Sequence, residues 1–217
     1  MYEDVIEIFK YLPIRREQLE NEYISYLSIT CSALDLSNEI SQPFMIMPFH
    51  LLFMLSLQYK LLRISKELKS KYLNAFIIKN ISRDINILCS PSSVFDLSLL
   101  QERSLPDLFR LVELDETTIK RIKKLIDYRN GNLAHANGGM AKEFDVKLHE
   151  YLDCLDILQN KFLKLNDKLA KKFKSEIKRG DDRNYFIETR LLKFYLCPTD
   201  FLKGDLNKKF GKVGSYI

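Results

Sequence analysis

The chain has 217 residues, of which 46% are hydrophobic and 29% charged, and its formal net charge is +5. This composition supplies enough apolar material for the core of one ordinary domain and excludes a globally disordered chain. The four cysteines, Cys31, Cys89, Cys154 and Cys197, lie far apart with no C-x-x-C pair. The sequence therefore favours buried free thiols over a disulfide framework or a zinc site.

The N-terminal residues MYEDVIEIFKYLPIRREQ carry acidic side chains early and do not resemble a secretory signal peptide. A helix is predicted over RREQLENEYISYLSITCSAL (15–34). The most apolar segment, PFMIMPFHLLFMLSLQYKLLRI (43–64), is interrupted by Pro48 and His50 and ends in a basic region. Its longest uninterrupted run of apolar residues is shorter than a membrane-spanning helix requires. We expect a central core helix after Pro48, with His50 as a core histidine; a membrane-associated protein is the alternative.

A further helix is predicted over SKYLNAFIIKNISRDINIL (70–88). The next stretch, CSPSSVFDLSLLQERSLPDLF (89–109), contains Pro91 and Pro106 and is expected to form only short turns of helix. The next helix is predicted over LDETTIKRIKKLIDYR (114–129), with Asp115 as its N-cap. Its spacing puts four apolar residues on one face: Ile119, Ile122, Leu125 and Ile126.

Between Met140 and Gly180, apolar residues recur at steps of three and four, which predicts one buried face of a long helix. This stripe consists of Leu148, Tyr151, Leu155, Leu158, Phe162, Leu165, Leu169, Phe173 and Ile177. The predicted fold is thus all-α, an antiparallel helical bundle of about four to five main helices within residues 1–180. Residues 181–217 are expected to form a loop-rich basic extension of unassigned structure.

Charge is unevenly distributed along the chain. Residues 161–217 hold 15 Lys and Arg against 7 Asp and Glu, whereas the first 160 residues hold 19 against 22. A basic C-terminal region suggests contact with an anionic partner, although a solvated helix face followed by a basic tail would give the same count.

One stretch, DYRNGNLAHANGG (127–139), concentrates glycine and histidine in a chain that has few of either. Phosphate-binding glycine loops, metalloprotease helices and serine nucleophile elbows are absent from the sequence, and the three histidines lack metal-ligand spacing. We therefore expect no metal and no cofactor. The remaining candidates are Arg129, Asn130 and His135. A histidine can transfer protons near neutral pH, and an arginine fork matches phosphate oxygens, so the pair suits phosphodiester chemistry.

Arg129 and His135 would point about 120° apart on a regular helix, because successive residues are rotated by about 100°. We expect the helix to end near Tyr128, with the Gly131-Asn132 step letting both groups reach one cleft. The motif contributes a single histidine, His135, and one such group per chain is insufficient if one group removes a proton from the substrate and another donates one. A two-fold homodimer would supply a second copy of His135 to a composite active site.

The Arg129-Asn130-x4-His135 pattern in an all-helical chain resembles the signature of the HEPN superfamily. The resemblance implies a metal-independent endoribonuclease that acts as a homodimer, with Arg129 and His135 catalytic and Asn130 supporting them. It also implies a cytoplasmic role in a toxin–antitoxin or anti-phage defence system, with an antitoxin or regulatory protein as a possible partner. The alternative is a catalytically inactive HEPN-like helical module that binds a protein partner or RNA, in which the motif stabilises a loop.

Overall fold

The computed structural model describes residues 7–12, 32, 42–79, 85–134 and 146–162. Its elements are η1 (Glu7–Tyr11), α3 (Gln42–Glu67), α4 (Lys69–Lys79), α5 (Ile85–Cys89), η3 (Phe95–Leu99), η4 (Glu102–Val112), α6 (Glu116–Ala134) and a helix over residues 146–162. Every element in these ranges is helical and none is a strand, which confirms the predicted all-α class. The predicted 15–34 helix, apart from Ser32, and the 181–217 extension lie outside the described residues.

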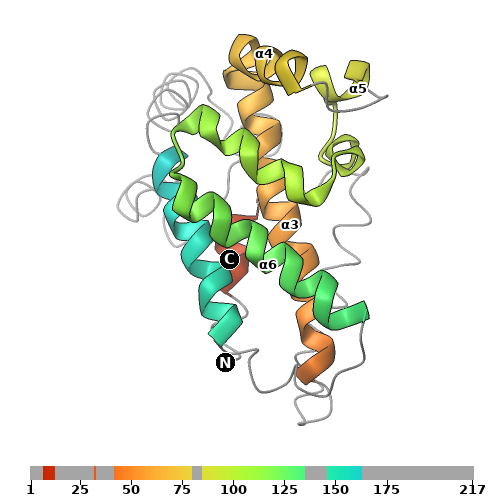
Figure 1. The fold of residues 1–217 in the computed structure, drawn as a ribbon, viewed down its shortest axis with the longest axis vertical. Helices are drawn as coiled ribbons and strands as arrows, with labels where there is room; N and C mark the ends of the chain where they lie inside the picture. Colours follow the sequence, from red (N-terminus) through yellow and green to blue (C-terminus); the bar gives the residue numbers. More distant parts are fainter. Residues whose placement is uncertain (1–6, 13–31, 33–41, 80–84, 135–145, 163–217) are drawn as a thin grey trace, which may run out of the picture.

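Helix α3 is the centre of the molecule, with η4 and α6 packed against it (Figure 1). Its buried residues occur all around the helix, not along one stripe, as expected for a helix covered on every side. The helix begins at Gln42, ahead of the predicted start, and Pro48 lies inside it. In the described part of the chain, no helix is both long and apolar enough to span a membrane.

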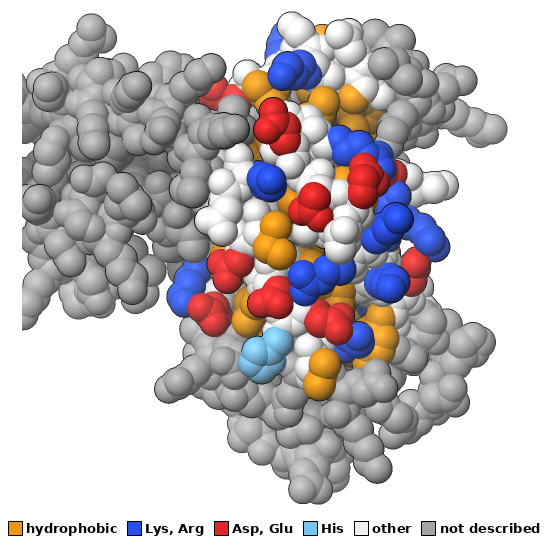
Figure 2. Space-filling view, turned by 60° about the vertical axis from the view of Figure 1, so that its left-hand side comes forward, with side chains coloured by type: hydrophobic (Ala, Val, Ile, Leu, Met, Phe, Trp, Pro, Cys, Tyr) orange, Lys and Arg blue, Asp and Glu red, His pale blue; other side chains and the backbone are white. Residues whose placement is uncertain are grey.

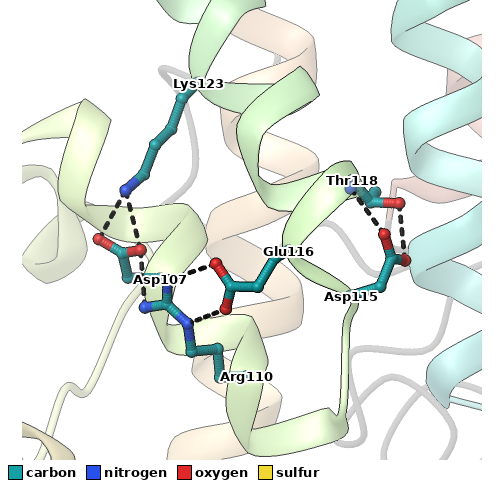
Figure 3. Close-up of polar contacts among 6 residues, drawn as sticks. All are labelled: Asp107, Arg110, Asp115, Glu116, Thr118 and Lys123. Carbon is teal, nitrogen blue, oxygen red and sulfur yellow. Dashed lines mark hydrogen bonds and ion pairs between the residues drawn. The ribbon is translucent and has the colours of Figure 1, made fainter.

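Helix α6 begins as the sequence predicts. The backbone N–H of Thr118 donates a 2.8 Å hydrogen bond to Oδ1 of Asp115, so Asp115 caps the helix (Figure 3). The predicted apolar face is confirmed, because all four of its residues are at most 1% exposed: Ile119, Ile122, Leu125 and Ile126. This face turns the helix toward α3 and fixes which residues remain on its outer surface.

Helices η4 and α6 form an antiparallel hairpin. Glu113, at φ 60°, ends η4 in the left-handed region, and α6 starts three residues later. A 3₁₀ helix rises about 2.0 Å per residue and an α-helix about 1.5 Å, so ten steps back along η4 and thirteen along α6 each cover about 20 Å. Residues 102 and 129 are consequently brought side by side, although 27 positions separate them.

Ion pairs connect the two arms of this hairpin along its length. They are Arg110 with Glu116, Asp107 with Lys123, Arg103 with Asp127, and Glu102 with Arg129. Figure 3 shows the first two, near the turn. The prediction of short helical turns over 89–109 was correct for η3 but too short for η4. Pro106 lies within η4. The helix accommodates it because the fixed φ of proline is close to a helical value and only one backbone N–H donor is missing.

The helix over residues 146–162 confirms the first half of the predicted stripe. Five stripe residues are completely buried: Leu148, Tyr151, Leu155, Leu158 and Phe162. The rings of Phe49 and Phe53 on α3 meet the ring of Tyr151 edge-on, at centroid distances of 5.6 and 4.7 Å. This aromatic contact holds Tyr151 in the core beside α3. Stripe positions beyond Phe162 lie outside the described residues.

Candidate functional site

Helix α6 carries the first part of the candidate motif. Arg129 and Asn130 lie near its end, but the helix does not stop near Tyr128 as predicted; it continues through Gly131 and Asn132 to Ala134. A single glycine inside a helix costs only about 1 kcal/mol, which the buried face of α6 outweighs. His135 follows directly after Ala134 and lies outside the described residues.

Arg129 is held by one carboxylate. Its Nη2 atom lies 2.6 Å from Oε1 and 2.5 Å from Oε2 of Glu102, and the two side chains are 20% and 38% exposed. Both bonds use a single nitrogen, so the ion pair leaves the Nε and Nη1 donors of the guanidinium unused. The Nε atom is buried and has no hydrogen-bond partner within the described ranges. Asn130 is exposed and, being rotated by about 100° from Arg129, lies on a different side of α6.

Behind this pair lies His50 of α3, which is fully buried as predicted. Its Nδ1 atom is 2.9 Å from the hydroxyl of Tyr151, and that hydroxyl is 3.3 Å from the carbonyl oxygen of Leu125. The hydroxyl has one proton, so the contact to which it donates depends on the tautomer of His50.

The other ring nitrogen of His50, Nε2, faces Glu102. The Nε2 atom of His50 lies 4.0 Å from Oε2 of Glu102 and has no hydrogen-bond partner among the described residues. Burial, and then the nearby charge of Arg129, lowers the pKa of His50 to about 3. The imidazole is thus neutral at physiological pH. The prediction of a core histidine is correct in position, and within the described residues one of its ring nitrogens has no hydrogen-bond partner.

The surrounding side chains complete the electrostatics of the site. Asp127 accepts a hydrogen bond from Arg103 at 2.9 Å. The ammonium of Lys147 lies 5.3 Å from the centre of the Tyr128 ring and is also paired with Glu150. In the part of the chain that the structure describes, His, Cys, Asp and Glu side chains form no group of three that could hold a metal ion.

No family model, no curated protein and no solved structure matches the chain. The site is thus defined by its own residues: Arg129 and Glu102 at the end of the η4–α6 hairpin, with His50 and Tyr151 beneath them.

Sequence reasoning missed Glu102 and the role of Tyr151. Neither residue lies near the Arg129 motif in sequence, and no local pattern connects them to it. The signal that could have found Glu102 is the equal length of the two hairpin arms, which requires η4 to be recognised as a helix of eleven residues. Tyr151 was predicted as part of an apolar stripe, and its hydroxyl gave no indication of a partner 101 positions away.

Proposed function

We propose that this chain is a metal-independent endoribonuclease of HEPN type that cleaves RNA by attack of a 2′-hydroxyl on the adjacent phosphate. The observation that carries the proposal is the state of Arg129. Its guanidinium is partly exposed, and both of its bonds to Glu102 use Nη2, so this ion pair does not consume its other donors. An oriented guanidinium can bind a phosphate and stabilise the extra negative charge of a pentacoordinate phosphorus.

In this proposal His135 transfers protons and Asn130 supports the pair. His135 directly follows Ala134, the last described residue of α6, and lies six positions beyond Arg129 in the sequence. A homodimer would bring a second His135 to a composite site. The basic residues of 161–217 would contact RNA phosphates, and toxin–antitoxin or anti-phage defence in the cytoplasm, under an antitoxin or regulatory protein, is the proposed setting.

A second candidate function is a catalytically inactive helical module that binds a protein partner or RNA. One observation favours it: Glu102 and Arg129 form the last of four ion pairs that connect η4 and α6. An arginine at this position therefore has a structural use without any catalysis. The exposed face in Figure 2 is consistent with either function, since basic and acidic side chains are interspersed over it.

The test compares purified wild-type protein with His135→Ala and His149→Ala on total RNA in the presence of EDTA. His149 is exposed on the 146–162 helix and serves as the matched histidine control. We expect wild type and His149→Ala to cut RNA and leave 2′,3′-cyclic phosphates, and His135→Ala to be inactive. Undiminished cleavage by His135→Ala would refute the proposal, and inactivity of all three folded proteins would favour the binding module.

A further inference from the structure

An arginine such as Arg129 can hold a phosphate with two nitrogens in two ways. The side-on fork uses Nε and Nη2, and the end-on fork uses Nη1 and Nη2, so Nη2 belongs to both forks. In Arg129 the side-on fork is closed, because Nε is buried and has no hydrogen-bond partner among the described residues. The side chain as a whole is 20% exposed, so the end-on fork is the one that a phosphate from solvent can reach.

Glu102 occupies the nitrogen that both forks need. Its Oε1 and Oε2 atoms lie 2.6 and 2.5 Å from Nη2 of Arg129, so both carboxylate oxygens are bound to one nitrogen. A phosphate can meet Nη1 alone while this contact lasts, but a bidentate contact requires the carboxylate to leave Nη2. The carboxylate and a bidentate phosphate therefore exclude one another at Arg129.

Another arginine–carboxylate pair of the same hairpin has a different geometry. Glu116 binds Arg110 through two nitrogens, with Oε1 at 2.5 Å from Nε and Oε2 at 2.8 Å from Nη2 (Figure 3). Two parallel hydrogen bonds of this kind give a strong, geometrically specific contact between arginine and carboxylate. The contact of Glu102 lacks the second nitrogen, so it holds Arg129 less firmly and is easier to exchange for a phosphate.

A displaced Glu102 carboxylate would keep a favourable position. Glu102 is the first residue of η4, where the N-terminal end of a helix favours a negative charge, and the N-cap residue Gln101 makes no capping side-chain hydrogen bond. The Glu102 side chain is also 38% exposed, so water can solvate it when it leaves Arg129. Nε2 of His50 faces it at 4.0 Å, but the lowered pKa of this imidazole leaves it without a positive charge that would hold the carboxylate.

We propose that Glu102 is an autoinhibitory carboxylate, which occupies Nη2 of Arg129 until an RNA phosphate displaces it. The inference rests on the proposed function, in which Arg129 binds the scissile phosphate. Each phosphate that binds must first break the contact with Glu102, which lowers its affinity. A free phosphate ion has no other contact to offset this loss, whereas an RNA strand carries further phosphates that can bind elsewhere on the protein. The contact thus keeps small phosphates out of the site.

The experiment measures equilibrium binding of the full chain to a fluorescently labelled, random-sequence 2′-O-methyl RNA, by fluorescence anisotropy at fixed ionic strength. This RNA lacks the 2′-hydroxyl and is not consumed during the measurement. The variants are Glu102→Gln, Arg129→Ala and the double variant. Glu116→Gln is the matched control, because it removes the same charge from an arginine pair near the turn of the hairpin. Circular dichroism and an unfolding midpoint verify the fold of each variant.

We expect Glu102→Gln to bind the RNA about tenfold more tightly than wild type, because the phosphate no longer replaces a hydrogen bond between two charged groups. Glu116→Gln should change the affinity by about twofold or less, since an exposed charge far from the site is screened by salt. The double variant should bind no more tightly than Arg129→Ala, because the gain acts through the guanidinium. If Glu102→Gln does not fold, Glu102→Asp replaces it; its shorter side chain keeps the charge but draws the carboxylate back from Nη2, and the same tightening is expected.

A folded Glu102→Gln protein with unchanged, weaker or undetectable RNA binding would overturn the inference, and so would an equal gain in Glu116→Gln or a gain that persists without Arg129. The ribonuclease function is judged separately, by cleavage of unmodified RNA. If wild type cleaves and Glu102→Gln binds no more tightly, the autoinhibitory role is wrong and the ribonuclease function stands. If Glu102→Gln binds more tightly through Arg129 and none of the proteins cleaves, the autoinhibitory contact stands and the ribonuclease function fails.

Discussion

Replacing Tyr151 with phenylalanine removes one oxygen atom from the core at the junction of three helices. The hydroxyl lies 2.9 Å from Nδ1 of His50 and 3.3 Å from the carbonyl oxygen of Leu125, and the side chain is completely buried. The Leu125 carbonyl keeps its partner within α6, which continues beyond it. Nδ1 of His50 has no such replacement among the described residues and becomes a buried nitrogen without a hydrogen-bond partner.

A net hydrogen bond contributes about 0.5 to 1.5 kcal/mol, and an unsatisfied buried donor costs about 1 to 3 kcal/mol. We therefore expect Tyr151→Phe to lower the free energy of unfolding by about 2 kcal/mol, which corresponds to about 4 to 8 °C in Tm for a chain of this size. The measurement is urea unfolding at pH 7, followed by circular dichroism.

Tyr72 provides the matched control. Its hydroxyl donates a single 2.9 Å hydrogen bond to the carbonyl oxygen of Leu88 and no imidazole depends on it. Tyr72→Phe should cost about 1 kcal/mol, less than Tyr151→Phe. The double variant His50→Phe/Tyr151→Phe should be less destabilised than the sum of its single variants, because neither polar group of the pair is left without its partner. Additive single-variant effects, or a Tyr151→Phe protein as stable as wild type, would refute the hydrogen bond between His50 and Tyr151.

Three further predictions concern stability and reactivity. The pKa of His50 is lowered to about 3 from an ordinary 6.5, so below about pH 6.5 the unfolded chain binds a proton that the folded chain does not, and acidification lowers the free energy of unfolding. Between pH 6.5 and 5 the expected loss is about 1.6 kcal/mol. Urea unfolding at a series of pH values should show this loss in wild type, and in His50→Phe the loss over the same range should be smaller by about that amount. Asp115→Ala should lower the free energy of unfolding by about 1 kcal/mol, because the N-cap of α6 is lost. Asp115→Asn should keep most of the stabilisation, since asparagine is also a good N-cap, and equal losses in the two variants would contradict the capping role. Burial raises the pKa of Cys154 to about 11, so iodoacetamide at pH 8 should label the Cys154 peptide only after unfolding, as followed by mass spectrometry.

Local signals in the sequence predicted local structure well. Asp115 as the N-cap of α6 and the apolar face of Ile119, Ile122, Leu125 and Ile126 were correct, because a cap and a helical stripe depend on residues within a few positions of one another. The end of α6 was predicted too early. The Asn-Gly step near Gly131 is a turn signal in an isolated segment, but here packing of the preceding helix carries the regular backbone through it to Ala134.

The site could be predicted only in part. Arg129 and His135 were selected by their chemistry and spacing, and Arg129 lies at the end of the hairpin with part of its side chain exposed. Its contact with Glu102 depends on the position of the turn between η4 and α6 and on the length of each helix. A short sequence motif contains neither. The hydrogen bond of His50 depends on a tyrosine hydroxyl from a third helix. Such long-range contacts arise from packing, and for that reason sequence patterns did not reveal them.

The requirement for a 2′-hydroxyl tests the ribonuclease account most directly. A random-sequence RNA and the same pool with 2′-O-methyl riboses are incubated with wild-type protein in EDTA, and the new 3′ ends are analysed. Because the proposed nucleophile is the 2′-oxygen, the account predicts cleavage of the first pool alone, with 2′,3′-cyclic phosphate ends. Cleavage of the methylated pool, or products without cyclic phosphate, would contradict it.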